Sequence, residues 1–183
     1  MKSPEKVVDH IANWLKNYLQ ISKMKGFVVG VSGGIDSAVT SALCARTGAP
    51  VLCLEMAIHQ EENQISRALD HIQWLKKSYK NVSHHSLELT PFFESFIECL
   101  PPTEKKKQQL LSLANTRARL RMSTLYYFAA LHNYLVAGTG NKVEDFGVGF
   151  YTKYGDGGVD LSPIADLLKT QVYELAKYLK IIE

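Results

Sequence analysis

Long hydrophobic runs are missing from this 183-residue sequence. The longest apolar stretch, Tyr126 to Gly138, is interrupted by His132 and Asn133 and falls short of the ~18 residues that a helix needs to cross a bilayer. The first residues also lack the apolar core of a signal peptide and instead indicate a helix start. We therefore expect a cytoplasmic protein without a membrane span.

Cysteines are few and the net charge is low. Cys44, Cys53 and Cys99 are widely spaced and form no C-x-x-C pair, which favours reduced thiols in or near the core. The formal net charge is only +3, and the one dense basic run, Lys105 to Lys107, is typical of a solvated helix start. The composition thus does not favour nucleic acid as a partner, whereas a small phosphate-rich ligand would suit the mild positive excess.

Short apolar runs alternate with segments of helical periodicity along the chain. The apolar runs predict strands over 27–31, 51–56, 82–87 and 134–138. Helical spacing predicts helices over 4–19, 36–46, 61–79, 91–99, 104–132 (as one helix or two) and 169–180, and five glycines predict a loop over 146–158. This order predicts an α/β fold with a doubly wound, mostly parallel sheet and helices on both faces, in a single domain spanning 1–183.

The segment Ser32-Gly33-Gly34-Ile35-Asp36-Ser37 lies between the first predicted strand and the next helix. Glycines there let backbone N–H groups face an oxyanion, and the helix start adds partial positive charge. Ser32 and Ser37 add hydroxyl donors. Asp36 would repel a bare phosphate, so its presence indicates a bridging divalent cation such as Mg²⁺. The loop therefore predicts a phosphate ligand and a metal together.

Other interpretations of this loop remain open. The glycines could make a plain turn capped by Asp36 or Ser37. Residues 30–34 also fit G-x-S-x-G, the nucleophile elbow of esterases. An elbow requires a downstream acid and then a histidine, but none of the histidines up to His132 lies in an obvious loop, and Asp36 would be unexplained. A Walker A loop is excluded because no lysine follows the glycines.

The loop resembles the pyrophosphate motif of the N-type ATP pyrophosphatases, and three later segments resemble motifs of the ammonia-dependent NAD synthetases. These segments are Asn115-Thr116-Arg117-Ala118-Arg119-Leu120-Arg121-Met122, Gly138-Thr139-Gly140-Asn141-Lys142-Val143-Glu144 and Thr152-Lys153-Tyr154-Gly155-Asp156-Gly157-Gly158. The resemblance implies an adenine nucleotide alpha hydrolase-like fold. It also implies a ligase that amidates deamido-NAD to NAD with ATP and ammonia, through an adenylated intermediate, and releases AMP and pyrophosphate.

The same resemblance implies roles for individual residues, none of them a covalent nucleophile. The carboxylates of Asp36 and Glu144 would hold Mg²⁺, and deamido-NAD would contact Arg119, Lys153 and Asp160. The residues implied for ATP are Gly30, Val31, Ser32, Gly33, Gly34, Ile35, Asp36, Ser37, Thr139 and Lys169. Lys169 is predicted at a helix start, where a cation is disfavoured, and this position favours a phosphate partner.

Several positions stay unassigned. Arg119 and Arg121 are two apart on a predicted helix and cannot share a face, so Arg121 has no assigned role, and neither has Asp156. Glu144 could also be a helix-start carboxylate. Some family members carry Asp-His-Ala-Ala between the threonine and the metal glutamate, where this chain has Gly140-Asn141-Lys142-Val143.

The resemblance further implies a homodimer through the apolar helix 110–131, which carries Leu113, Leu120, Leu125 and Phe128. The chain has no room for a glutaminase domain, so we expect free ammonia as the nitrogen source unless a separate subunit supplies it. The ending Ile181-Ile182-Glu183 lacks a helix stop, and the family continues with another ATP-contacting threonine, so we expect missing downstream sequence. A ligase or thiolase acting on tRNA and a non-catalytic nucleotide-binding module remain alternatives.

Overall fold

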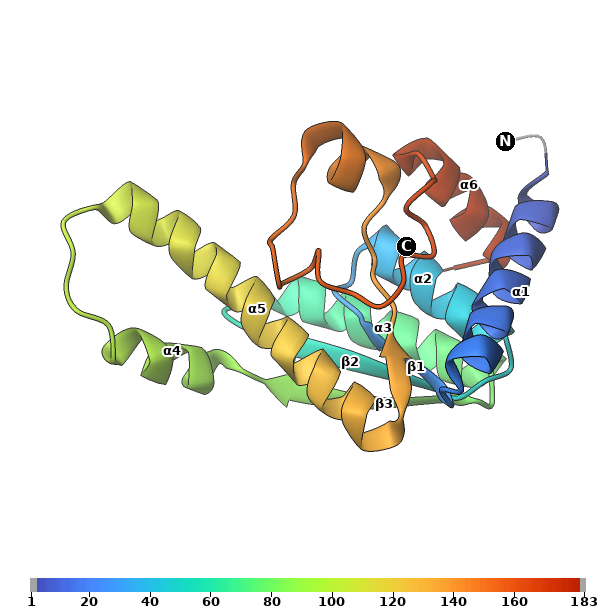
Figure 1. The fold of residues 1–183 in the computed structure, drawn as a ribbon, viewed down its shortest axis with the longest axis horizontal. Helices are drawn as coiled ribbons and strands as arrows, with labels where there is room; N and C mark the ends of the chain where they lie inside the picture. The colour runs from blue at the N-terminus through green and yellow to red at the C-terminus, as the bar shows by residue number, and fades with distance from the viewer. Residues whose placement is uncertain (1–2, 182–183) are drawn as a thin grey trace.

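A four-stranded parallel sheet forms the centre of the computed structural model, which describes residues 3–181. The strand order is β3-β2-β1-β4 (Figure 1). The chain therefore adds β2 and β3 on one side of β1 and then returns to place β4 on the other side. β1 aligns Phe27 with Val51 of β2 on one side and Gly26 with Tyr134 of β4 on the other. The strands are β1 (Gly26–Gly30), β2 (Val51–Ala57), β3 (Val82–Glu88) and β4 (Tyr134–Val136).

Helices cover both faces of this sheet, as predicted. The elements are α1 (Pro4–Ser22), α2 (Ile35–Arg46), α3 (Glu62–Ser78), α4 (Thr90–Glu98), α5 (Lys106–His132), the π-helix η1 (Val143–Val148) and α6 (Lys169–Leu179). The helices α1, α2, α3 and α6 share one core with the sheet, and α5 crosses the opposite face. The side chain of Ser3 caps α1, and Pro4 occupies its first turn.

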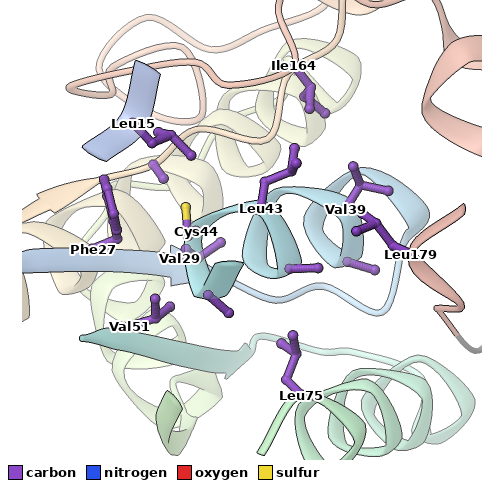
Figure 2. Close-up of a cluster of buried hydrophobic side chains, with 14 of the residues drawn as sticks. Leu15, Phe27, Val29, Val39, Leu43, Cys44, Val51, Leu75, Ile164 and Leu179 are labelled. Atoms are coloured by element: carbon purple, nitrogen blue, oxygen red, sulfur yellow. The ribbon is translucent and has the colours of Figure 1, made fainter. Parts of the chain in front are cut away.

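Two hydrophobic cores form because successive strand residues point to opposite faces of the sheet. On one face, Phe27, Val29 and Val51 pack with Leu43 and Leu75 (Figure 2). This core buries residues 37–45 of α2 without a break, which explains the small side chains of that helix. On the other face, Val28 and its β2 neighbours Leu52, Leu54 and Met56 pack against Met122, Leu125 and Ala129 of α5.

A few sequence expectations were wrong. β4 ends at Val136 instead of Gly138, because Ala137 pairs in an isolated bridge with Leu161. The predicted loop 146–158 begins within the π-helix η1. Cys44 and Cys53 are buried, but Cys99, which directly follows α4, is exposed. Ile182 and Glu183, part of the ending that suggested missing sequence, lie outside the described residues.

Within residues 3–181, none of the helices combines the length and apolar character needed to span a bilayer.

Candidate active site

A cavity of about 600 Å³ opens at the carboxyl ends of the strands. The segment 30–32 after β1 and the segment 137–139 after β4 both line it. It thus lies where the strand order reverses, the position at which open α/β sheets bind ligands. Its walls include the apolar side chains Leu54, Met56, Met122 and Leu125. Volume and lining suit a nucleoside whose polar end reaches the Ser32 loop.

The Ser32–Ser37 loop is ordered by its own hydroxyl groups. The two Oγ atoms of Ser32 and Ser37 lie 3.2 Å apart, Ser37 Oγ donates to Gly34 O at 2.9 Å, and Gly34 N donates to Ser32 Oγ at 3.3 Å. α2 starts directly behind this loop, so its unpaired first-turn N–H groups face the same region. In the described part of the chain no histidine bonds to Ser32, and the nucleophile-elbow interpretation gains no support.

Gly33 is the position in this loop that requires glycine. Its φ is +80°, and an added Cβ would lie 2.5 Å from Gln64 O of α3. Gly34, in contrast, has φ −94°, and its Cβ would approach nothing closer than Ser32 Oγ at 3.4 Å.

Gly33→Ala is expected to lower the free energy of unfolding by about 2 kcal/mol, through left-handed strain and the contact with α3. Gly34→Ala is the matched control, with an expected change below about 0.5 kcal/mol. Urea unfolding followed by circular dichroism measures both. Equal losses for the two variants would contradict this account.

Three charged side chains from distant segments meet beside the loop. Lys169, the first residue of α6, contacts Asp36 Oδ2 through its Nζ atom, and the same Nζ lies 3.3 Å from Glu144 Oε1. Partial burial lowers the pKa of Lys169, but the hydrogen bonds and negative charges of Asp36 and Glu144 outweigh this effect and leave the pKa raised. The ammonium group therefore stays charged between two carboxylates.

The carboxylates of Asp36 and Glu144 are close enough together to bind one divalent cation. Both reach a single point, because both contact the same Nζ, so one cation can bridge them. Among residues 3–181, no group of three or more His, Cys, Asp or Glu side chains is placed to hold a metal. Mg²⁺ characteristically takes one or two carboxylates and completes its shell with water and substrate phosphates. Asp36 and Glu144 match this pattern.

The residues predicted to bind ATP lie in or beside the cavity. Gly30, Val31, Ser32 and Thr139 line it. Gly33 to Ser37 continue from its edge into α2, and Lys169 joins them through Asp36. Their role in ATP binding remains a prediction, but the fold brings all of them to one region.

The residues predicted to contact deamido-NAD do not line the cavity. Arg119 is exposed on α5, and its Nε donates to Lys153 O at 3.1 Å. Asp160 accepts from Val136 N at 2.8 Å and from Tyr126 OH at 3.0 Å. Arg119 and Tyr126, which hold Lys153 and Asp160, are two helical turns apart on α5. Arg119, Lys153 and Asp160 therefore lie along one side of this helix. Asp160 has a structural role here that the sequence did not reveal.

Arg121 lines the cavity, although the sequence left it unassigned. Its Nε donates to Met56 O and its Nη2 to Gln60 Oε1, each at 3.0 Å. Ala118, Met122 and Leu125 line the cavity from the same helix. The spacing 118, 121, 122 and 125 is that of one helix face, and this pattern could have separated Arg121 from Arg119.

Comparison with known proteins agrees with this geometry. The family model described as NAD synthase matches residues 7–183. The NH(3)-dependent NAD(+) synthetase of Carboxydothermus hydrogenoformans is 36% identical over 185 residues, which cover 98% of this chain and 72% of that protein. The corresponding protein of Mycoplasma genitalium is 39% identical over 180 residues, covering 97% and 69%.

Solved structures show the same relationship. NMN synthetase from Francisella tularensis superimposes with a TM-score of 0.86 at 36% identity, covering 98% of this chain and 72% of that one. NH3-dependent NAD synthetase from Campylobacter jejuni gives 0.86 at 34% identity, covering 98% and 74%. The predicted adenine nucleotide alpha hydrolase-like fold is thereby confirmed. On the match of residues 7–183 and on these relatives, the chain belongs to the NAD synthase family.

Proposed function

We propose that the protein is a ligase that amidates deamido-NAD to NAD, using ATP and ammonia. One observation carries the proposal: a nucleotide-sized cavity ends at a serine and glycine loop beside the Asp36, Lys169 and Glu144 cluster, in a chain of the NAD synthase family. The relatives named as NH(3)-dependent NAD(+) synthetases support the choice of substrate and nitrogen source.

The reaction proceeds in two steps. The nicotinate carboxylate of deamido-NAD attacks the α-phosphorus of ATP, the bond to the bridging oxygen breaks, and pyrophosphate leaves. Ammonia then attacks the adenylated carbonyl carbon, loses a proton and displaces AMP. The Ser32–Ser37 loop and the start of α2 bind the departing pyrophosphate, and Lys169 stabilises its growing negative charge.

Asp36 and Glu144 would hold Mg²⁺, which supplies charge neutralisation to the phosphates when bound. Arg119, Lys153 and Asp160 would contact deamido-NAD beside the cavity, since their chain neighbours Ala118, Thr152 and Val159 line it. No side chain needs to act as a covalent nucleophile, because the substrate carboxylate itself attacks ATP.

We also propose that the protein forms a homodimer in the cytoplasm. Three large apolar side chains of α5 that do not line the cavity lie in solvent, namely Leu110, Tyr127 and Leu131, which are 59–71% exposed. Leu125, in contrast, packs against the sheet, so only part of the apolar character of this helix serves the fold. A second copy would cover the exposed set. The buried cysteines and the ATP requirement suit a reducing, ATP-rich compartment.

Product analysis tests the function. Incubation with ATP, MgCl₂, ammonium chloride and deamido-NAD is expected to give NAD, AMP and pyrophosphate in equal amounts, and no pyrophosphate when deamido-NAD is left out. ATP binding measured by calorimetry without any turnover would instead identify a non-catalytic nucleotide-binding module.

A second substrate deserves a direct comparison, because a structurally similar relative is named an NMN synthetase. An enzyme of that kind would amidate the deamidated mononucleotide by the same chemistry. The ratio of kcat/KM for deamido-NAD and for nicotinate mononucleotide decides between the two substrates. We expect the dinucleotide to be preferred, and a preference for the mononucleotide would reassign the substrate while leaving the adenylation chemistry intact.

A further inference from the structure

Asn141 is completely buried in the segment that follows β4. Its Nδ2 donates to Asp36 Oδ1 at 3.1 Å. Its Oδ1 accepts from the backbone N–H groups of Val143 at 3.0 Å and Glu144 at 3.2 Å. One amide group thus joins α2 to the start of η1, two segments 105 residues apart in the chain.

These bonds reach both predicted metal ligands, Asp36 through its carboxylate and Glu144 through its backbone N–H group. Asp36 Oδ1 is engaged by Asn141, whereas Oδ2 contacts Lys169 Nζ. A single oxygen of Asp36 is therefore directed at the point where the two carboxylates meet. The bonds to the 143 and 144 amides hold the backbone that carries Glu144 at the same point.

We propose that Asn141 is a positioning residue that holds Asp36 and Glu144 in register for one divalent cation. The proposal rests on the metal site of the proposed function and adds to it the group that assembles that site. Asn141 itself would touch neither the cation nor the substrates, because it acts through the two carboxylates.

The chemistry of the amide explains why asparagine suits this position. It offers a donor for the carboxylate and an acceptor for the two backbone N–H groups in one planar group. Aspartate would still accept from the backbone, but it would place a second negative charge against Asp36. Leucine would leave the buried backbone groups without partners. Ligand-orienting residues of this kind typically change metal affinity by 10- to 100-fold when replaced.

The neighbouring Gly140 fits the same arrangement. A Cβ at this position would collide with the side-chain carboxylate of Asp145. The absence of a side chain at Gly140 therefore leaves room for Asp145 beside the segment that holds Asn141.

The test compares Asn141→Asp with Asn81→Asp. The side chain of Asn81 also donates to two backbone carbonyl oxygens, those of the buried Ala45 and the partly buried Ala49, but it is remote from the carboxylates. Mn²⁺ binding is followed by electron paramagnetic resonance in the presence of a non-hydrolysable ATP analogue. We expect Asn141→Asp to weaken Mn²⁺ binding by about 10- to 100-fold and Asn81→Asp by less than about twofold.

Two further readouts separate positioning from general damage. For Asn141→Asp, the apparent KM for Mg²⁺ should rise while kcat at saturating Mg²⁺ falls less. Asn141→His, whose ring also offers one donor and one acceptor, should restore much of the Mn²⁺ affinity. Thermal unfolding of each variant shows that the comparison is made on folded protein.

Wild-type Mn²⁺ affinity in Asn141→Asp would overturn the inference alone, with the proposed function intact. An equal loss of Mn²⁺ affinity in Asn81→Asp would overturn it as well, because the loss would then result from lower protein stability and not from a role at the carboxylates. Absence of Mn²⁺ binding by the wild-type protein with the ATP analogue would overturn both the inference and the proposed metal site.

Discussion

Asp36→Asn is expected to lower the rate of pyrophosphate release from ATP by about 10³-fold. The substitution keeps the size of the side chain, and the amide oxygen can still accept from Asn141 Nδ2. It removes the negative charge that faces Lys169 Nζ and that we propose as a metal ligand. Pyrophosphate release with saturating ATP, deamido-NAD and Mg²⁺ measures the effect.

Two controls make the Asp36 result specific. Asp166→Asn replaces an exposed carboxylate away from the cavity and should leave the rate unchanged. The free energy of unfolding of Asp36→Asn should change by less than about 1 kcal/mol, since Lys169 is partly exposed and keeps Glu144 as a partner. ATP turnover that stays within about threefold of the wild-type rate would refute the assigned role of Asp36.

Lys169→Met should have two opposite effects. Pyrophosphate release should fall by about 100-fold, because a cation that stabilises the leaving group is lost. Mn²⁺ affinity in the absence of nucleotide should instead rise by about tenfold, since the ammonium group no longer occupies the point between Asp36 and Glu144. We propose that, in the wild-type protein, Lys169 and the divalent cation compete for this point until the phosphates of ATP bind the lysine.

Lys177→Met provides the matched control, because Lys177 is an exposed lysine near the end of the same helix. It should change neither the rate nor the Mn²⁺ affinity. A fall in nucleotide-free Mn²⁺ affinity for Lys169→Met would show that the lysine supports the carboxylate pair and does not compete with the metal.

Much of the fold could be predicted from the sequence, because its local patterns are strong. The apolar run 27–31 and the small residues of 36–46 indicated a buried strand and a buried helix, and β1 and α2 lie within one residue of those bounds. The end of β4 was predicted less well. Ala137 and Gly138 are as apolar as the strand, but they pair with Leu161, which lies far along the chain.

The site was predicted only in part, because local motifs identify single residues but not the long-range contacts between them. Asp36 and Glu144 could be named from motifs, and the fold brings them together. The link through Asn141 and the contact with Lys169 join segments more than 100 residues apart, and sequence spacing carries no information about such contacts. Arg121 was left open, although it shares one helix face with the apolar residues Met122 and Leu125, and that spacing could have indicated which of the two arginines faces the cavity.

The apolar walls of the cavity have a consequence for the fate of the intermediate. An adenylated carboxyl group reacts with water as well as with ammonia, and water is far more concentrated. Leu54, Met56, Met122 and Leu125 offer water no hydrogen-bonding partners on their side of the cavity. Few solvent molecules would therefore be held near the activated carbonyl from this side. In the proposed reaction, these hydrophobic side chains would thereby help determine how much ATP is wasted for each amide formed.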